Sequence, residues 1–330
     1  MNHLDSGLTV GFIGLGAMGS EMATNLLQSL KAQGQTLHVY NRTESKAQKL
    51  VDAGAIFESG GPVAMASKCN IIFSMTFDDQ ALEENISKIL EGPPRQGLIY
   101  VECSTVFPET VKKVSTLSEA NGIAYVACPV FGRPDAAKSK LLVGVLAGPS
   151  KHVEKVRPFV AAMTCRVLDV GVDPCLANVD KLVGNFMIAG MIELIAEAQT
   201  LGEVNGLERS KVMEVVDLIF GGSHIVKGYG DRMVHDNFAI KDGCGFTVRG
   251  GLKDTGHIQR LADESGAKVP INETVVQHLK SQMADGCADL DWGSLAMAVR
   301  KVISTLIDAV CTSNDKPILL FRTQLTKNRE

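Results

Sequence analysis

Hydrophobic residues in the first half of the chain form short apolar runs that alternate with segments of helical spacing. The runs cover residues 8–14, 37–40, 71–75, 98–102, 124–130, 141–147 and 166–170. The segments with apolar residues three or four positions apart cover residues 45–52, 79–90, 108–121 and 150–163. Strands that alternate with helices are typical of parallel sheets, because each parallel connection must cross over the sheet. The pattern predicts an α/β domain with a doubly wound parallel sheet over residues 1–173.

The second half of the chain shows no strand signal of comparable strength. Its candidate helices cover residues 177–205, 210–220, 224–236, 253–265, 271–285 and 294–309. The first of these is apolar on nearly all sides, as expected for a helix that lies between neighbours. We therefore expect a long interdomain helix and an all-helical domain over residues 174–309, followed by a polar, basic tail of unknown role at 310–330.

Two polar residues lie on an otherwise apolar face of the helix expected at 177–205. Lys181 and Asn185 are four residues apart, so they project from the same face about one turn from each other. Burial of an unpaired ammonium group is costly. Lys181 is therefore expected either to reach water from the first turn of the helix or to face a wet, functional cleft.

A glycine-rich turn separates the first predicted strand from a segment with helical spacing. It reads Gly14-Leu15-Gly16-Ala17-Met18-Gly19. In such a turn the first glycine allows the tight bend, the second lets the backbone approach a pyrophosphate, and the third lets helix pack on strand. The phosphates then lie at the amino terminus of the helix. With a second strand at 37–40, this arrangement favours dinucleotide binding over a glycine-rich loop without a ligand.

The residues after the second predicted strand indicate which dinucleotide is bound. An NAD-selective site places a carboxylate there against the ribose hydroxyls, whereas this chain has Asn41-Arg42-Thr43. The Arg42 guanidinium could bind a 2′-phosphate, and Asn41 and Thr43 could add hydrogen bonds. We expect NADPH to be preferred over NADH; the alternative is that Arg42 is a solvated surface residue.

Composition narrows the classes of partner. The 330 residues, of which 45% are hydrophobic, suit a soluble α/β protein of two domains. A net charge of −4 gives no general attraction for nucleic acid or anionic membranes, so neither partner is expected. The eight cysteines include no C-x-x-C pair, which indicates reduced thiols rather than a metal site or a disulfide framework. The polar amino terminus lacks the apolar core of a signal peptide, and we expect a cytoplasmic protein.

Four sequence blocks, with a fifth nearer the carboxyl terminus, carry a resemblance to a known family. They are the glycine turn at 14–19, Ser104-Thr105-Val106, Cys128-Pro129-Val130-Phe131-Gly132, Lys181 with Asn185, and Phe246 followed by Lys253-Asp254. Over residues 8–308 the chain resembles the β-hydroxyacid dehydrogenase family, which includes 3-hydroxyisobutyrate and tartronate semialdehyde reductases. The resemblance implies an oxidoreductase that interconverts a 3-hydroxy acid, or a related alcohol, and its carbonyl form by hydride transfer.

The resemblance also implies roles for individual residues. Lys181 would be the general acid or base at the carbonyl oxygen, and Asn185 would orient the same oxygen. The cofactor would contact the glycine turn. Met75 and Thr76 would lie near its adenosine half, Thr105 near its nicotinamide ribose, and Phe246 and Lys253 near its nicotinamide end. The substrate would contact Lys181, Asn185, Ser104, Phe131, Gly132 and Arg133.

Departures from the family bear on the substrate. Gly184 stands where related phosphogluconate dehydrogenases have a histidine, which argues against a phosphosugar and against oxidative decarboxylation. The family's substrate loop has a serine and two glycines that hold a carboxylate, whereas this chain has Phe131-Gly132-Arg133. Either Arg133 compensates as a charged clamp, or Phe131 narrows and dries the pocket for a less polar carbonyl compound.

Two other functions stay open at this point. An imine reductase or reductive aminase is kept open by Phe131 and by the apolar late helices, although such enzymes generally replace the lysine that is retained here. A non-catalytic dinucleotide-binding interaction module, as in some chromatin-associated relatives, is disfavoured by the same lysine. Glycines at 184, 190 and 202 permit close helix approach, and relatives pair through the helical half, so we expect a homodimer or a higher homo-oligomer.

Overall fold

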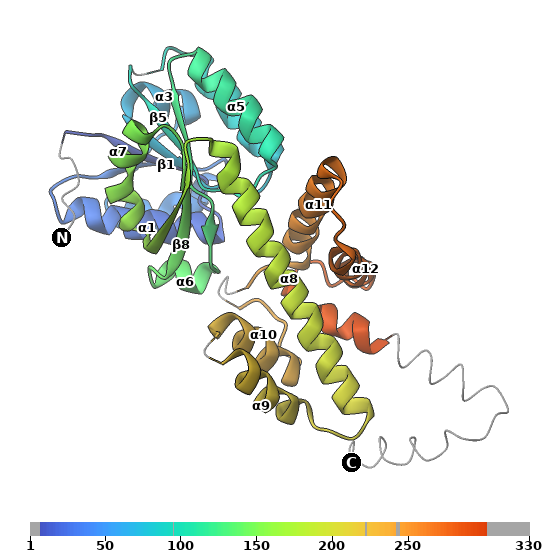
Figure 1. Cartoon of the computed structure of the whole chain (residues 1–330). Coiled ribbons are helices and arrows are strands. Elements are labelled where there is room, and N and C mark those ends of the chain that lie inside the picture. Colours follow the sequence, from blue (N-terminus) through green and yellow to red (C-terminus); the bar gives the residue numbers. More distant parts are fainter. Residues whose placement is uncertain (1–6, 95, 222, 242–244, 302–330) are drawn as a thin grey trace. The chain divides into compact units, whose positions relative to one another are not determined.

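The computed structural model describes residues 7–94, 96–221, 223–241 and 245–301 (Figure 1). The chain divides into two compact units, of which the first comprises Met1–Asn185 with Lys241–Gly245 and the second comprises Phe186–Ile240 with Phe246–Glu330. Helix α8 (Pro174–Val204) belongs to both, because the first unit ends and the second begins within it. The domain boundary predicted at 173/174 lies at the start of this helix.

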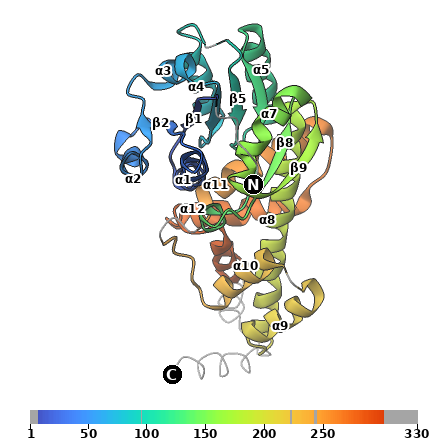
Figure 2. The same cartoon turned by 90° about the vertical axis from the view of Figure 1, so that its left-hand side faces the viewer.

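The first unit is built around one sheet. Its strands are β1 (Val10–Ile13), β2 (Leu37–Tyr40), β3 (Ile56–Phe57), β4 (Ile71–Ser74), β5 (Ile99–Glu102), β6 (Ala124–Ala127), β7 (Val130–Phe131), β8 (Leu142–Ala147) and β9 (Thr164–Gly171). Their order is β3-β2-β1-β4-β5-β6-β8-β7, with β9 paired to β8. Figure 2 labels β2, β1, β5, β8 and β9 of this series. The pairs from β3 to β6 are parallel and run outward in both directions from β1. This is the predicted doubly wound, Rossmann-type sheet.

The sheet departs from parallel pairing beyond β6. Strand β8 is antiparallel to both β6 and β7, and β9 is parallel to β8. The single strand predicted at 124–130 is wrong, because Cys128 and Pro129 separate β6 from β7. Proline has no N–H to donate to a sheet ladder, which favours a break at this position.

Helices cover both faces of the sheet. They are α1 (Ala17–Lys31), η1 (Glu44–Ala47), α2 (Gln48–Asp52), α3 (Gly61–Lys68), α4 (Asp79–Ile89), α5 (Pro108–Ala120), α6 (Pro134–Lys138) and α7 (Ser150–Ala161). One face, which includes Phe12 and Phe73, packs against α1 and α7. The opposite face, which includes Ile72 and Tyr100, packs against α3, α4 and α5. Successive strand residues point to opposite faces, so both faces of these apolar strands are buried.

The second unit is helical. It contains the later part of α8, α9 (Arg209–Phe220), α10 (His224–Val234), α11 (Val248–Ser265), α12 (Pro270–Ala284), η2 (Trp292–Ser294) and a helix described from 295 to 301. The rest of the helix predicted at 294–309, and the tail at 310–330, lie outside the described residues. Trp292 is buried and donates a hydrogen bond of 2.7 Å to the Tyr229 hydroxyl. Trp292 therefore packs between helices of this unit.

The helices and the ionisable side chains of the described residues bear on membrane spans and metal sites. None of its helices is both long and apolar enough to cross a membrane. No group of three or more His, Cys, Asp or Glu residues there is arranged to hold a metal ion. The cytoplasmic location stays a prediction.

Candidate active site

The three glycines of the turn after β1 have different surroundings. Gly14 has φ +90°, and a Cβ there would lie 2.2 Å from the Met75 carbonyl oxygen. A Cβ at Gly19 would lie 1.9 Å from the Gly14 carbonyl oxygen, whereas one at Gly16 would meet nothing within 4 Å. The first and third glycines are therefore needed by the fold, and the second leaves open space at the amino terminus of α1. This space fits a pyrophosphate, which would accept hydrogen bonds from the backbone N–H groups of Ala17 and Met18.

Asn41 connects the glycine turn to the loop after β2. Its Oδ1 accepts a hydrogen bond of 2.8 Å from the Leu15 N–H, and its Nδ2 donates one of 2.9 Å to the Thr43 carbonyl oxygen. Arg42 and Thr43 between these contacts are exposed. Asn41 therefore shapes the loop, and Arg42 is the residue there whose charge faces solvent.

The loops after β4 and β5 are joined through the Ser104 hydroxyl. Its oxygen accepts a hydrogen bond of 2.6 Å from the Thr76 N–H and lies 3.1 Å from the Thr76 hydroxyl. Met75 and Thr105 flank this contact and are half-buried. The structure therefore brings together Met75, Thr76, Ser104 and Thr105 at the carboxyl ends of neighbouring parallel strands, where α/β proteins bind their ligands.

Glu102, the last residue of β5, binds the loop that follows this strand. It was not identified from the sequence. It is fully buried, and its Oε1 accepts a hydrogen bond of 2.8 Å from the Ser104 N–H. Among the described residues, its Oε2 and the buried hydroxyls of Ser74, Tyr100 and Tyr125 have no hydrogen-bond partner of normal geometry, although Ser74 and Tyr100 lie close enough to the carboxyl to lower its pKa. Burial raises the pKa of Glu102 to about 7, although hydrogen bonds from Ser104 lower it. A carboxylate that ends an apolar run directly before a predicted site block was the available signal.

Lys181 and Asn185 form a buried pair on α8. The Lys181 ammonium donates a hydrogen bond of 2.9 Å to Asn185 Oδ1, and the two residues are 7% and 6% exposed. The ammonium also lies 4.1 Å from the centroid of the Phe131 ring. Lys181 therefore does not reach bulk water from the first turn of the helix. Asn178, one turn earlier, accepts a hydrogen bond of 3.1 Å from the Val106 N–H, which fixes this part of α8 to the loop after β5.

The segment from the end of β7 to the start of α6 places an apolar ring and an ion pair next to each other in sequence. Phe131 is half-buried, and Gly132 has φ +131° with a Cβ position 2.5 Å from Leu142 Cδ2. Arg133 Nη2 lies 3.2 Å from Asp135 Oδ2. Burial raises the pKa of Asp135, but the hydrogen bond and charge of Arg133 lower it below its usual value. Arg133 therefore already has a carboxylate partner in the first turn of the adjacent helix α6.

Phe246 and Lys253 belong to the second unit. The Phe246 N–H donates a hydrogen bond of 3.1 Å to Asp291 Oδ2. The centroid of the Phe246 ring lies 5.0 Å from that of Trp292, in an edge-to-face arrangement. Lys253 Nζ lies 2.9 Å from the buried Asp254 Oδ1. Their contact with the cofactor stays a prediction.

Two family descriptions match the chain and together cover most of it. Residues 9–171 match the NAD binding domain of 6-phosphogluconate dehydrogenase. Residues 176–299 match the NAD-binding domain of NADP-dependent 3-hydroxyisobutyrate dehydrogenase. The chain belongs to the β-hydroxyacid dehydrogenase family. It is thus an oxidoreductase of hydroxyl or carbonyl groups that uses a nicotinamide dinucleotide.

Individual members of the β-hydroxyacid dehydrogenase family are similar over nearly their whole length. The chain is 32% identical over 296 residues to the uncharacterized oxidoreductase YfjR of Bacillus subtilis, covering 89% of this chain and 100% of the relative. It is 31% identical over 286 residues to the NADH-dependent oxidoreductase ucdB of Aspergillus ustus, covering 86% and 96%. The structure of Mycobacterium tuberculosis 3-hydroxyisobutyrate dehydrogenase with L-serine has a TM-score of 0.78 at 21% identity, covering 89% and 99%.

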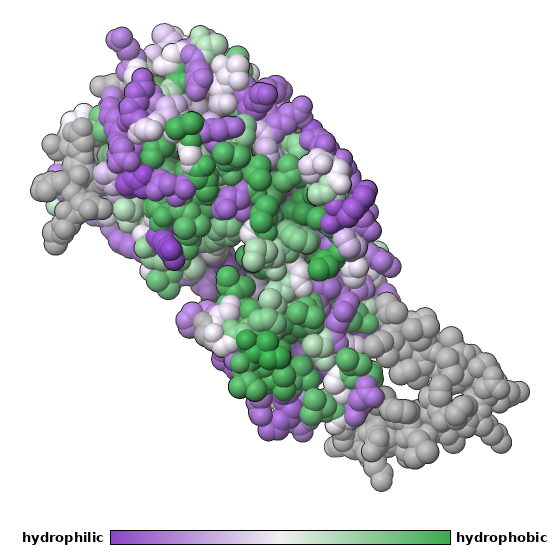
Figure 3. Space-filling view, in the orientation of Figure 1, coloured by the Kyte–Doolittle hydropathy of each residue, from purple (hydrophilic) through white to green (hydrophobic). Residues whose placement is uncertain are grey.

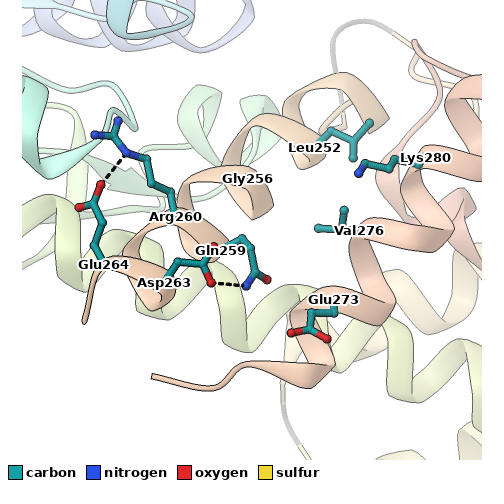
Figure 4. Close-up of a pocket in the computed structure, with 9 residues that line it drawn as sticks. All are labelled: Leu252, Gly256, Gln259, Arg260, Asp263, Glu264, Glu273, Val276 and Lys280. Carbon is teal, nitrogen blue, oxygen red and sulfur yellow. Dashed lines mark hydrogen bonds and ion pairs between the residues drawn. The ribbon is translucent and has the colours of Figure 1, made fainter. Parts of the chain in front are cut away.

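The second unit also has a cavity of about 550 Å³ between α11 and α12 (Figure 4). Its lining comprises Leu252, Gly256, Gln259, Arg260, Asp263, Glu264, Glu273, Val276 and Lys280. Two pairs of these residues bind each other, since Arg260 Nε lies 2.8 Å from Glu264 Oε1 and Gln259 Nε2 lies 3.1 Å from Asp263 Oδ1. None of the predicted site residues lines this cavity.

Proposed function

We propose that the protein is an NADP(H)-dependent oxidoreductase that interconverts a 3-hydroxy acid, or a related alcohol, and its carbonyl form. The observation that supports this proposal is the buried contact of 2.9 Å between Lys181 Nζ and Asn185 Oδ1 on one face of α8. A buried lysine with a polar partner is suited to proton transfer, and the family supplies the oxidoreductase framework.

The proposed mechanism divides the work between the cofactor and the helix. When bound, the nicotinamide supplies or accepts the hydride. During reduction Lys181 donates a proton to the carbonyl oxygen as negative charge develops on it, and during oxidation it removes the proton from the alcohol. Asn185 holds the ammonium through Oδ1 and orients the substrate oxygen with its amide N–H. Burial of both side chains strengthens these interactions, because little water screens them.

The cofactor preference is tested at Arg42. Replacing Arg42 with alanine should weaken NADPH binding about tenfold to a hundredfold and NADH binding much less, because a charge-assisted contact to the 2′-phosphate is lost. The relative from Aspergillus ustus is named for NADH, so the preference for NADPH rests on this chain's own residues. Dissociation constants for both cofactors, measured by fluorescence titration, decide the question. Equal losses for NADPH and NADH would show that Arg42 does not bind the 2′-phosphate.

The substrate carboxylate is tested at Arg133. If Arg133 is a carboxylate clamp, Arg133→Ala should raise KM steeply for carbonyl acids and leave neutral carbonyl compounds nearly unchanged. Asp135→Ala is the matched control, because it removes the ion-pair partner and should leave KM for acids unchanged or lower it. Steady-state kinetics with an acid and a neutral substrate measure both variants. If Arg133→Ala leaves KM for acids unchanged, the apolar pocket shaped by Phe131 becomes the preferred description.

Imine reduction is the second candidate function, and the Phe131 ring beside Lys181 is the observation that favours it. An apolar ring at the reactive group suits a less polar substrate. The decisive experiment follows NADPH oxidation with carbonyl acids, with neutral aldehydes and ketones, and with ketones supplied together with amines. Turnover with carbonyl compounds alone supports the proposed function, whereas turnover that requires the amine would overturn it.

We further infer a homodimer or a higher homo-oligomer. Hydrophobic side chains gather on the surface of the second unit over α9 and α10 (Figure 3). They include Val215, Leu218, Ile219 and Ile225, of which Leu218 is 85% exposed. An exposed apolar group of this kind is typical of an interaction surface. Light scattering at micromolar concentration should give at least twice the mass of one chain, and a monomeric mass would refute the inference.

A further inference from the structure

The Phe131 ring lies directly against the backbone of α8 at Gly184. A Cβ at Gly184 would lie 2.3 Å from Phe131 Cζ and 2.4 Å from Cε1, which is closer than side chains approach each other. Any larger residue at 184 must therefore displace the ring. Glycine inside a helix is unfavourable relative to alanine. The close contact between the Phe131 ring and the Gly184 backbone, here called the seat of the ring, gives a physical reason for a glycine at this position.

The seated ring also contacts Lys181. Residues 181 and 184 are three apart on one helix, so they share a face. The ammonium lies 4.1 Å from the ring centroid, well within the range in which an aromatic face attracts a cation. The attraction is stronger where water is excluded, and Lys181 is 7% exposed. Phe131 and Asn185 therefore contact the same ammonium with an aromatic face and a carbonyl oxygen.

We propose that Phe131 is a positioning residue whose ring, seated on Gly184, holds the Lys181 ammonium where it transfers its proton. The proposal rests on the proposed function, because it requires Lys181 to be the general acid or base. It also gives Gly184 a role, because any side chain at position 184 would displace the ring from this contact. Lysine has four rotatable side-chain bonds, so an uncovered ammonium would sample several positions.

Removing the aromatic face should lower kcat rather than weaken substrate binding. Phe131→Leu keeps an apolar residue of similar size but loses the cation–π contact, and we expect kcat to fall about tenfold to a hundredfold with little change in KM. Phe131→Tyr retains the aromatic face and should keep kcat close to the wild-type value. If Phe131 only lines the substrate pocket, Phe131→Leu will instead change KM and leave kcat intact, which overturns the proposal.

Gly184→Ala tests the contact between the Phe131 ring and the backbone of α8 without changing the Phe131 side chain itself. Alanine is favourable inside a helix, so the variant should fold, while its methyl group displaces the ring and should lower kcat to the same extent as Phe131→Leu. The double variant Phe131→Leu/Gly184→Ala should be no slower than either single variant, because both changes remove the same contact. Additive losses would show that Gly184 acts independently of the ring and would overturn the proposal.

Lys181→Met separates failure of the proposal from failure of the proposed function. If Lys181→Met abolishes turnover while Phe131→Leu and Gly184→Ala leave kcat unchanged, the proposed function stands and the positioning role is wrong. If Lys181→Met retains turnover, both are wrong. Melting temperatures of all four single variants check that each loss of kcat occurs in folded protein.

Discussion

Replacing Lys181 with methionine should lower kcat by about a hundredfold to ten-thousandfold, the contribution of a positioned general acid. Methionine keeps a flexible, apolar stem of similar length but has no proton to donate. It can also pack against the Phe131 ring through its sulfur. Cofactor affinity should change by only a few-fold, because the glycine turn and Arg42 lie on other elements of the fold. Folding should survive, because the charged group of a residue that is only 7% exposed is replaced by an apolar group.

One preparation of Lys181→Met is enough for this test. Its kcat, its NADPH dissociation constant and its melting temperature are compared with those of wild type and of Lys113→Met. Lys113 is a suitable control because its side chain is 64% exposed and pairs with Glu83 on the surface. Retained turnover, or a collapse of stability together with lost cofactor binding, would mean that Lys181 is structural and that the proposed mechanism is wrong.

The elements that were predicted from sequence are those whose pattern is long or chemically specific. Strand β1, the glycine turn and α1 follow from an apolar run, three spaced glycines and a helical period. Helix α8 follows from its length, although it begins at Pro174 rather than 177. Strand β3 and helices α3 and α6 were not predicted. They have only two, eight and five residues, and so short a segment carries too few residues for periodicity to distinguish it from a loop.

The candidate site was only partly accessible from sequence, for a physical reason. Lys181 and Asn185 are close because a helix places residues four apart on one face, which sequence spacing alone determines. The contact between Phe131 and Gly184 joins segments 53 residues apart and depends on how β7 packs against α8. The ion pair between Arg133 and Asp135 is local, but the sequence did not indicate that it would occupy the proposed clamp.

Glu102 was missed because its significance lies in burial, which alters its acid–base chemistry. The strand pairing places Ser74 beside Glu102 and Tyr125 beside Tyr100. Alternate strand residues share a face, so one carboxyl and three hydroxyls gather on one side of the sheet. Sequence reasoning treats a glutamate at the end of a strand as a solvated residue. In this fold the helices over that face exclude water and favour the neutral carboxyl.

Glu102→Gln should therefore stabilise the protein above neutral pH and leave its stability nearly unchanged near pH 5. Burial raises the pKa of this carboxyl from 4.5 to about 7. Between these two pH values Glu102 is therefore protonated in the folded protein and ionised in the unfolded chain. Its contribution to the free energy of unfolding is greatest below pH 4.5, falls as the pH rises to about 7, and is constant above that. The total change amounts to about 3 kcal/mol. Glutamine keeps an oxygen for the Ser104 N–H and does not titrate.

Urea unfolding of wild type and Glu102→Gln at pH 5, 6, 7 and 8 measures this effect directly. Other titrating groups contribute equally to both proteins, so the difference between their unfolding free energies isolates Glu102. That difference should grow in favour of the variant from pH 5 to pH 8. A difference that does not vary with pH would show that Glu102 is ionised throughout in the folded protein. Hydrogen bonds to the carboxylate would then be strong enough to offset the free-energy cost of burying its charge, and the loops after β4 and β5 would be bound by an ionised Glu102.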